Sequence, residues 1–202
     1  RMVLDDPGLE GIGAVLFDEF HERSLDADLG LALSVEAQNL LRPDLRLVVM
    51  SATLDGAVVS GRLDAPVIES LGRTYPIETR YLGRPDRLED GIVRAVLAAL
   101  SGETGSILVF LPGQGEIRRV EALLAERIRD PAVIVAPLYG ALDFKAQDLA
   151  ISPAPVGRRK VVLATSIAQT SLTIEGVRVV IDSGLARVPR FDPGSVLTRL
   201  KT

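Results

Sequence analysis

Four short runs of apolar residues, each bounded by polar loops, constrain most strongly what the second half of the chain can fold into. They are SILVFL (106–111), AVIVAPLY (132–139), KVVLAT (160–165) and VRVVID (177–182). Segments with apolar residues at helical spacing, 116–128 and 143–151, separate the first three runs. Strands that are apolar on both faces and alternate with helices are typical of a parallel sheet covered by helices on both sides. We therefore predict an α/β fold.

The beginning of the chain predicts a smaller arrangement of the same kind. An apolar run that ends at Phe17 indicates a strand, and residues 24–41 indicate a helix. The helix prediction rests on the leucines that recur at helical spacing, Leu25, Leu29, Leu33 and Leu40. LRLVVM (45–50) then predicts a second buried strand, which ends at the polar loop SATLDG.

A glycine- and proline-containing connection, LGRTYP, places a domain boundary near Gly72. After it, IETRYL (77–82) alternates like a strand, and residues 88–102 have the spacing of a helix. At the other end, two extended runs around Asp192 and Gly194 predict a hairpin.

Composition excludes several classes of function. The 202 residues include no cysteine and one histidine, which rules out disulfides, cysteine-bound zinc and a multi-histidine metal site. The net charge of −4 argues against a general polyanion binder, so nucleic acid would have to contact local basic loops and backbone N–H groups. The apolar runs are too short to span a membrane, and no signal peptide is visible. The absence of cysteine suits a reducing cytoplasm.

The stretch AVLFDEFHERSL (14–25) places two carboxylates, Asp18 and Glu19, at the end of a predicted strand, followed by His21. Ligands of open α/β sheets bind outside the carboxyl ends of the strands. There Asp18 suits Mg²⁺ binding and Glu19 suits orientation of an attacking water, as phosphoryl transfer requires. An acidic N-cap and first turn for the following helix explains the pair equally well, and a lone histidine is usually a hydrogen-bonded loop residue.

Several segments, taken in order, resemble a known family. VLFDEFHER, LRLVVMSATLD, SILVFLPGQGEI, PLYGAL and KVVLATSIAQTSLTIEGVRVVIDSGLAR are similar to the ordered motifs of the DEAH-box ATP-dependent RNA helicases of superfamily 2, and most of all to those of the bacterial HrpB-type branch. The resemblance implies two RecA-like domains. Residues 1–72 would be the C-terminal part of the first, and 73–202 most of the second with a terminal β-hairpin.

The resemblance implies a role for each motif residue. Asp18 would bind Mg²⁺, Glu19 would activate water, and His21 would couple the nucleotide site to the second domain. The motif SAT, which is Ser51, Ala52 and Thr53, would link ATP hydrolysis to domain movement, although such a loop is also a common turn with hydroxyl caps.

In the second domain, the resemblance implies that Thr165 and Ser166 contact nucleic-acid phosphates, and that Thr173 and Glu175 face the nucleotide. Gln114 lies where the family has a nucleic-acid-facing motif, with a plain turn as the alternative. Basic residues at the predicted hairpin are candidates for phosphate attraction, namely Arg187, Arg190, Arg199 and Lys201. The basic run of Arg158, Arg159 and Lys160 is interpreted as a solvated turn in preference to a nucleic-acid contact.

The 202 residues contain no G-x-x-x-x-G-K-[ST] loop, which would cradle the phosphates of ATP. We therefore expect a fragment of a helicase that uses ATP and Mg²⁺, acts on single-stranded or duplex RNA, or on DNA, and does not bind ATP tightly by itself. A non-catalytic nucleic-acid-binding or interaction module is the main alternative, and an ATPase that remodels complexes without unwinding is a third.

Overall fold

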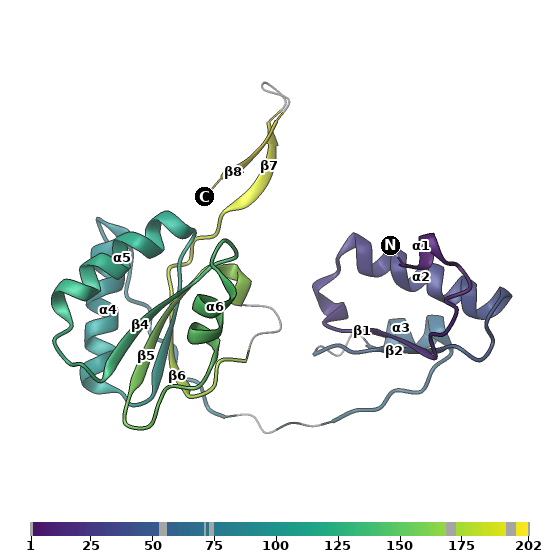
Figure 1. Cartoon of the computed structure of the whole chain (residues 1–202), viewed down its shortest axis with the longest axis horizontal. Coiled ribbons are helices and arrows are strands. Elements are labelled where there is room, and N and C mark those ends of the chain that lie inside the picture. The colour runs from purple at the N-terminus through teal and green to yellow at the C-terminus, as the bar shows by residue number, and fades with distance from the viewer. Residues whose placement is uncertain are drawn as a thin grey trace. The chain divides into compact units, whose positions relative to one another are not determined.

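The computed structural model describes residues 2–52, 56–70, 72, 75–168, 173–192 and 197–201. The chain forms two compact units, Arg1–Glu78 and Thr79–Thr202 (Figure 1). The predicted boundary near Gly72 lies in the connection between them, whose described residues between 65 and 85 contain no helix or strand. Within the described part of the chain, no helix combines the length and apolar character that crossing a membrane requires.

The first unit contains two parallel strands with helices around them. Its elements are α1 (Met2–Asp5), β1 (Ala14–Phe17), the 3-10 turn η1 (Phe20–Glu22), α2 (Leu25–Leu40), β2 (Arg46–Val49) and α3 (Gly56–Leu63). The register pairs Ala14 with Arg46 and Phe17 with Val49. Because the strands are parallel and in register, the residues that follow β1 and β2 meet at one edge of the sheet.

Helix α2 confirms the predicted span, but the predicted stripe is not its buried face. Leu25 is 82% exposed and Leu40 is 72% exposed, whereas Leu31, Ser34 and Ala37 are buried. The helix is apolar on more than one side, so the spacing of its leucines could not decide which side packs against the unit.

The strand predicted at 77–82 is absent. Residues 75–85 form no strand, and Ile77 and Tyr81 are 88% and 93% exposed. An alternating pattern needs a neighbouring strand to complete its hydrogen bonds, and among the described residues none pairs with this segment.

The second unit contains the predicted parallel sheet. Its elements are α4 (Leu88–Gly102), β3 (Ser106–Phe110), α5 (Gln114–Arg127), β4 (Val133–Leu138), α6 (Phe144–Ile151), β5 (Arg159–Ala164), the 3-10 turn η2 (Ser166–Ala168) and β6 (Val177–Asp182). The four strands lie in the order β4-β5-β3-β6 and all are parallel. The α/β prediction is confirmed.

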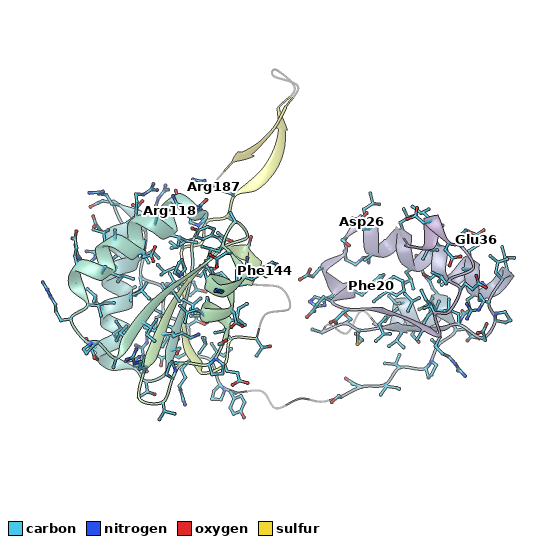
Figure 2. The ribbon with its side chains drawn as sticks, viewed as in Figure 1. Phe20, Asp26, Glu36, Arg118, Phe144 and Arg187 are labelled. Carbon is cyan, nitrogen blue, oxygen red and sulfur yellow. The ribbon has the colours of Figure 1, made fainter. Side chains whose placement is uncertain are left out.

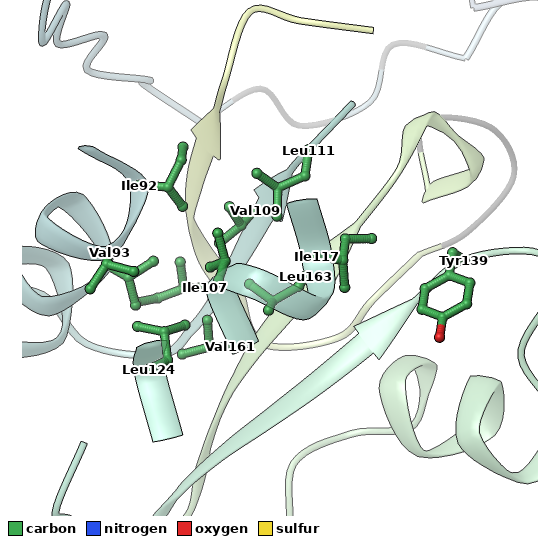
Figure 3. Packing of buried hydrophobic residues seen from close by; sticks show 12 residues of the cluster. Ile92, Val93, Ile107, Val109, Leu111, Ile117, Leu124, Tyr139, Val161 and Leu163 are labelled. Carbon is green, nitrogen blue, oxygen red and sulfur yellow. The ribbon is translucent and has the colours of Figure 1, made fainter. Parts of the chain in front are cut away.

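Two apolar clusters hold this sheet between its helices. On one face, Ile107 and Val109 of β3 pack with residues of α4 and α5 such as Val93 and Ile117 (Figure 3). On the other face, Leu108 belongs to a cluster with Ala150 of α6, Val162 of β5 and others. Neighbouring residues of one strand therefore serve opposite faces, as a buried parallel strand requires.

The basic run at the start of β5 is a correction to the sequence analysis. Lys160 is 1% exposed, and its Nζ donates to the carbonyls of Leu149, Ala150 and Ser152 at the end of α6. Arg159 donates to the carbonyls of Gly105 (2.7 Å) and Leu100 (2.9 Å). Arg158 alone is exposed as the solvated turn predicts. Backbone carbonyls at the ends of α4 and α6, and that of Gly105 before β3, bind the other two cations.

The chain ends in the predicted hairpin. Strands β7 (Val188–Asp192) and β8 (Leu197–Lys201) pair antiparallel, with Val188 opposite Lys201. The predicted turn at Pro193 and Gly194 lies outside the described residues. The side chains of Arg190, Arg199 and Lys201 are also outside the description, so their predicted contacts with phosphate stay predictions.

Candidate functional site

The loop after β1 carries the first group of predicted residues. The Glu19 N–H donates to Asp18 Oδ1 at 2.9 Å, and Glu19 has a φ of 49° in the left-handed region. That conformation is uncommon for a residue other than glycine and often marks a functional site. The Asp18 side chain is exposed and that of Glu19 is about one third exposed, so both can meet a ligand from solvent.

This loop does not cap helix α2. Ser24 is its N-cap, because its Oγ accepts a hydrogen bond from the Ala27 N–H at 3.1 Å. Glu19 precedes the turn η1 without any capping contact from its side chain. The interpretation of Asp18 and Glu19 as the cap of α2 is therefore wrong, and the capping function belongs to a serine nearer the helix.

His21 connects the loop after β1 to the loop after β2. Its Nδ1 lies 3.3 Å from Glu19 Oε2 and accepts a hydrogen bond, also at 3.3 Å, from the Ala52 N–H. One nitrogen cannot accept a proton from Ala52 and donate one to Glu19 at the same time. The two contacts therefore represent alternatives that depend on whether Nδ1 carries a proton.

Backbone hydrogen bonds fix the same two loops together. The Phe20 N–H donates to the Met50 carbonyl at 3.0 Å, and the Met50 N–H donates to the Phe17 carbonyl at 2.8 Å. The Phe20 ring (Figure 2) is buried. It lies edge-on against Phe17, with ring centroids 6.3 Å apart, and the Arg23 guanidinium lies 6.0 Å from the Phe20 centroid. Phe20 thus packs in the interior of the unit and fixes the position of the loop after β1.

The structure therefore brings Asp18, Glu19, His21, Ser51 and Ala52 to one edge of the first sheet. Thr53 of the same motif lies outside the described residues. Within the described part of the chain, no cluster of three or more acidic or histidine side chains has the arrangement of a protein-enclosed metal site. Mg²⁺ in phosphoryl-transfer sites takes one or two carboxylates together with water and phosphate oxygens, and the Asp18 and Glu19 pair fits that smaller donor set.

A second candidate site lies at the carboxyl edge of the larger sheet. An open pocket of about 250 Å³ is lined there by Phe110, Leu111, Pro112, Ser166, Asp182, Gly184, Leu185, Ala186 and Arg187. These residues lie at or just after the ends of β3, β5 and β6, which meet because the strands are parallel. The Ser183 N–H donates to the Phe110 carbonyl at 3.1 Å, which holds the loop after β6 against the end of β3.

The predicted residues of the second unit fall into two places. Thr165 is half-buried and Ser166 is exposed at the end of β5, and Gln114 begins α5 just after the end of β3. Glu175 instead precedes β6, where the Gly176 carbonyl accepts from the Ser106 N–H at the start of β3. Glu175 thus lies near the amino ends of the strands, whereas Ser166 lies at their carboxyl ends. Thr173, which is exposed, precedes Glu175 in the same segment.

Arg187 makes a contact that the sequence analysis missed. Its Nη2 donates to Glu116 Oε1 of α5 at 3.0 Å, and the same oxygen accepts from Arg119 Nη2 at 2.8 Å. Glu116 and Arg119 stand three residues apart, which is the spacing of neighbours on a helix, so that part was visible in the sequence. The partnership with Arg187, which is 71 residues away, had no local signal.

Comparison with known proteins relates the chain to helicases. Residues 90–199 match the model of the helicase conserved C-terminal domain. The chain is 55% identical over 205 aligned positions to the ATP-dependent RNA helicase HrpB of Escherichia coli, covering 100% of the chain and 25% of HrpB. It is 40% identical to the pre-mRNA-splicing factor ATP-dependent RNA helicase prp22 of Schizosaccharomyces pombe, covering 96% of the chain and 17% of prp22.

A solved structure agrees with these sequence matches. The crystal structure of Escherichia coli DEAH/RHA helicase HrpB superposes with a TM-score of 0.88 over 99% of this chain and 26% of that one. The chain thus spans about a quarter of this relative. The resemblance to the DEAH-box RNA helicases is confirmed, and the chain belongs to the helicases that share the helicase conserved C-terminal domain.

Proposed function

We propose that the chain works within an ATP-dependent RNA helicase, in which it supplies the metal-and-water part of the ATP site and part of the RNA-binding surface. One observation at the edge of the first sheet carries this proposal. Asp18 and Glu19 do not cap α2, and His21 Nδ1 accepts a hydrogen bond from the Ala52 N–H. The similarity to HrpB and prp22, which are named as ATP-dependent RNA helicases, supports the same activity.

In this proposal Asp18 holds the metal, and Glu19 accepts the proton of the water that attacks the terminal phosphate of ATP. Bound Mg²⁺ would neutralise charge on the phosphate oxygens. When Glu19 gains a proton or the nucleotide leaves, the contact between His21 and Glu19 changes. Since Nδ1 of His21 can either meet Glu19 or accept from the Ala52 N–H, a change in the first contact alters the second, in the loop after β2.

The pocket at the edge of the larger sheet suits a phosphate backbone. Its lining includes the hydroxyl of Ser166, and Pro112 of the lining lies two residues before the first N–H groups of α5, which begins at Gln114. Such groups bind phosphate without reading sequence, which agrees with a motor that moves along RNA of any sequence. The nucleotide-facing roles of Thr173 and Glu175 stay predictions, as do Mg²⁺ as the metal, DNA as a second substrate and a cytoplasmic location.

RNA-stimulated ATP hydrolysis by the complete protein tests the proposal. We expect hydrolysis to rise severalfold on addition of single-stranded RNA and to accompany separation of a tailed RNA duplex. A protein that binds RNA without hydrolysing ATP would contradict the proposal and favour the non-catalytic binding module. A protein that hydrolyses ATP with RNA and separates no strands would favour the remodelling ATPase.

A further inference from the structure

Glu116 of α5 is a buried carboxylate that the proposed chemistry does not use. Its side chain is 11% exposed, and Oε1 accepts hydrogen bonds from two guanidinium groups, Arg119 at 2.8 Å and Arg187 at 3.0 Å. Among the described residues, no donor reaches the buried Oε2. Burying a carboxylate is costly unless it is paired with cations, so both arginines are needed to hold this charge inside the unit.

The network extends beyond α5 to a second helix. Arg119 Nε donates to Glu89 Oε1 of α4 at 2.6 Å, and the Glu89 side chain is 15% exposed. Negative and positive groups therefore alternate from Glu89 through Arg119 and Glu116 to Arg187. Three parts of the unit that are distant in sequence are joined by this Glu116 network: the start of α4, the first turns of α5 and the loop after β6.

Arg187 connects the Glu116 network to the hairpin. Arg187 directly precedes β7, the first strand of the hairpin, and it lines the pocket at the carboxyl edge of the sheet (Figure 2). Gly113, which directly precedes α5, comes close as well: a Cβ there would stand 3.0 Å from Arg187 Nη1 and 3.1 Å from Glu116 Oε2. The loop that ends at Gly113 and the loop that leads to the hairpin thus meet at one carboxylate.

We propose that Glu116 is a positioning residue that anchors Arg187, so that the base of the hairpin is held rigidly against α5 while strands are separated. The proposal rests on the helicase function proposed above. In this arrangement the positive charge of Arg187 balances Glu116 in place of an RNA phosphate. Without Glu116, the Arg119 and Arg187 guanidinium groups would face each other with like charge, and the loop before β7 would move away from α5.

The main test compares variants of the complete protein by the number of duplexes separated per ATP hydrolysed. We expect Glu116→Ala and Arg187→Ala each to lower this ratio at least fivefold, and the double variant to be no worse than either single one, because both remove the same contact. Glu116→Gln should keep more than half of the ratio, since its amide oxygen can still accept from Arg187. Ratios at the wild-type value, or losses that multiply in the double variant, would overturn the proposal.

Arg118→Ala is the matched control, because Arg118 is the exposed neighbour of Arg119 on α5 and has no ion pair among the described residues (Figure 2). Salt dependence separates anchoring from direct RNA contact. A phosphate contact contributes about 0.7 to the slope of log K against log salt for single-stranded nucleic acid. We expect both Arg187→Ala and Arg118→Ala to keep the wild-type slope; a slope smaller by about 0.7 in Arg187→Ala would assign Arg187 to phosphate and overturn the anchor.

Hydrogen exchange keeps the inference separable from the helicase proposal. If the wild-type protein separates no strands, the helicase proposal fails, but exchange of the backbone amides of 183–192 still reports on the anchor. We expect faster exchange there in Glu116→Ala than in Arg118→Ala, and equal exchange would overturn the anchor. If Glu116→Ala does not fold, Arg187→Ala provides the same comparison, because its side chain is 39% exposed and its removal leaves the core intact.

Discussion

Lys160 is a residue of one element, β5, that binds the last carbonyls of another, the helix α6. Its ammonium group is buried at the start of β5 and donates to three carbonyls at the end of α6. Desolvation by burial lowers the pKa of Lys160 from its ordinary value. From sequence alone, a run of three basic residues is assigned to solvent, because lysine and arginine are seldom buried. The carbonyls that accept from Lys160 belong to residues 8 to 11 positions earlier, and their approach depends on the tertiary fold.

We predict that Lys160→Met destabilises the second unit by about 2 kcal/mol, the cost of leaving buried carbonyls without a donor. Methionine keeps most of the volume of the lysine stem, so the effect isolates the ammonium group. Hydrogen exchange of the β5 amides in the complete chain measures it. Lys145→Met on the exposed side of α6 is the control, and equal exchange in the two variants would contradict the role of Lys160.

Arg42 and Asp44 form a second such contact in the first unit. Arg42 donates to both oxygens of Asp44 at 2.8 Å and to the carbonyls of Gly8, Leu9 and Ile12. The hydrogen bonds from Arg42 lower the pKa of Asp44 from 3.8 to about 2. Since the folded-state pKa is depressed, the stabilisation is complete above pH 3.8 and is lost as the pH falls through about 2.

The carboxyl carbon shift of Asp44, followed by NMR during an acid titration, checks this prediction. We expect a midpoint near 2 in the wild-type chain and a return toward 3.8 in Arg42→Ala. Glu36→Gln, a change on the exposed side of α2, should leave the Asp44 midpoint unaltered. A wild-type midpoint near 3.8 would show that the Arg42 contact does not form.

At the scale of elements, strands were more predictable than the faces of helices. The central strands β3 and β5 are apolar runs buried on both faces, and such a run needs no knowledge of its neighbours, whereas residues of the edge strand β6 alternate between half-buried and exposed. The buried face of α2 could not be predicted, because it depends on which side of the helix packs against the sheet. The strand predicted at 77–82 does not form, because a strand needs a neighbouring strand to pair with. Helix α3, with two glycines in GAVVSGRL, was not predicted because glycine weakens the helical signal.

The candidate site followed the same division. Asp18, Glu19 and the SAT motif stand at strand ends, and the rule for parallel sheets places strand ends together. The contact of His21 with Ala52 and that of Glu116 with Arg187 join residues 31 and 71 positions apart through side chains. Such contacts depend on packing in three dimensions, which a single sequence does not contain.

Ser24 provides a prediction about an element. We expect Ser24→Ala to weaken the first turn of α2 by about 1 kcal/mol, because the Ala27 N–H loses its acceptor. Ser24→Asp, which keeps an acceptor, should retain most of the stability. Hydrogen exchange of the amides at 25–28 measures both, and similar exchange in Ser24→Ala and the wild-type chain would show that another group caps the helix.

At the scale of the whole molecule, the two units differ in how completely they bury apolar surface. The larger sheet has clusters on both faces, with Val109, Val161 and Leu163 fully buried. The two-stranded sheet of the first unit leaves Leu16 61% and Val48 43% exposed, and two paired strands are marginally stable in water. We predict cooperative thermal unfolding for residues 79–202 expressed alone and no cooperative transition for residues 1–78, measured by calorimetry; the reverse result would contradict this account of the cores.

If the edge of the first sheet activates water for ATP hydrolysis, Glu19→Gln in the complete protein tests that role most directly. The substitution keeps the size of the side chain and removes its ability to accept a proton. We expect ATP binding to stay near the wild-type affinity and RNA-stimulated hydrolysis to fall at least about a hundredfold, the usual contribution of a general base. Hydrolysis near the wild-type rate in Glu19→Gln would contradict the claim.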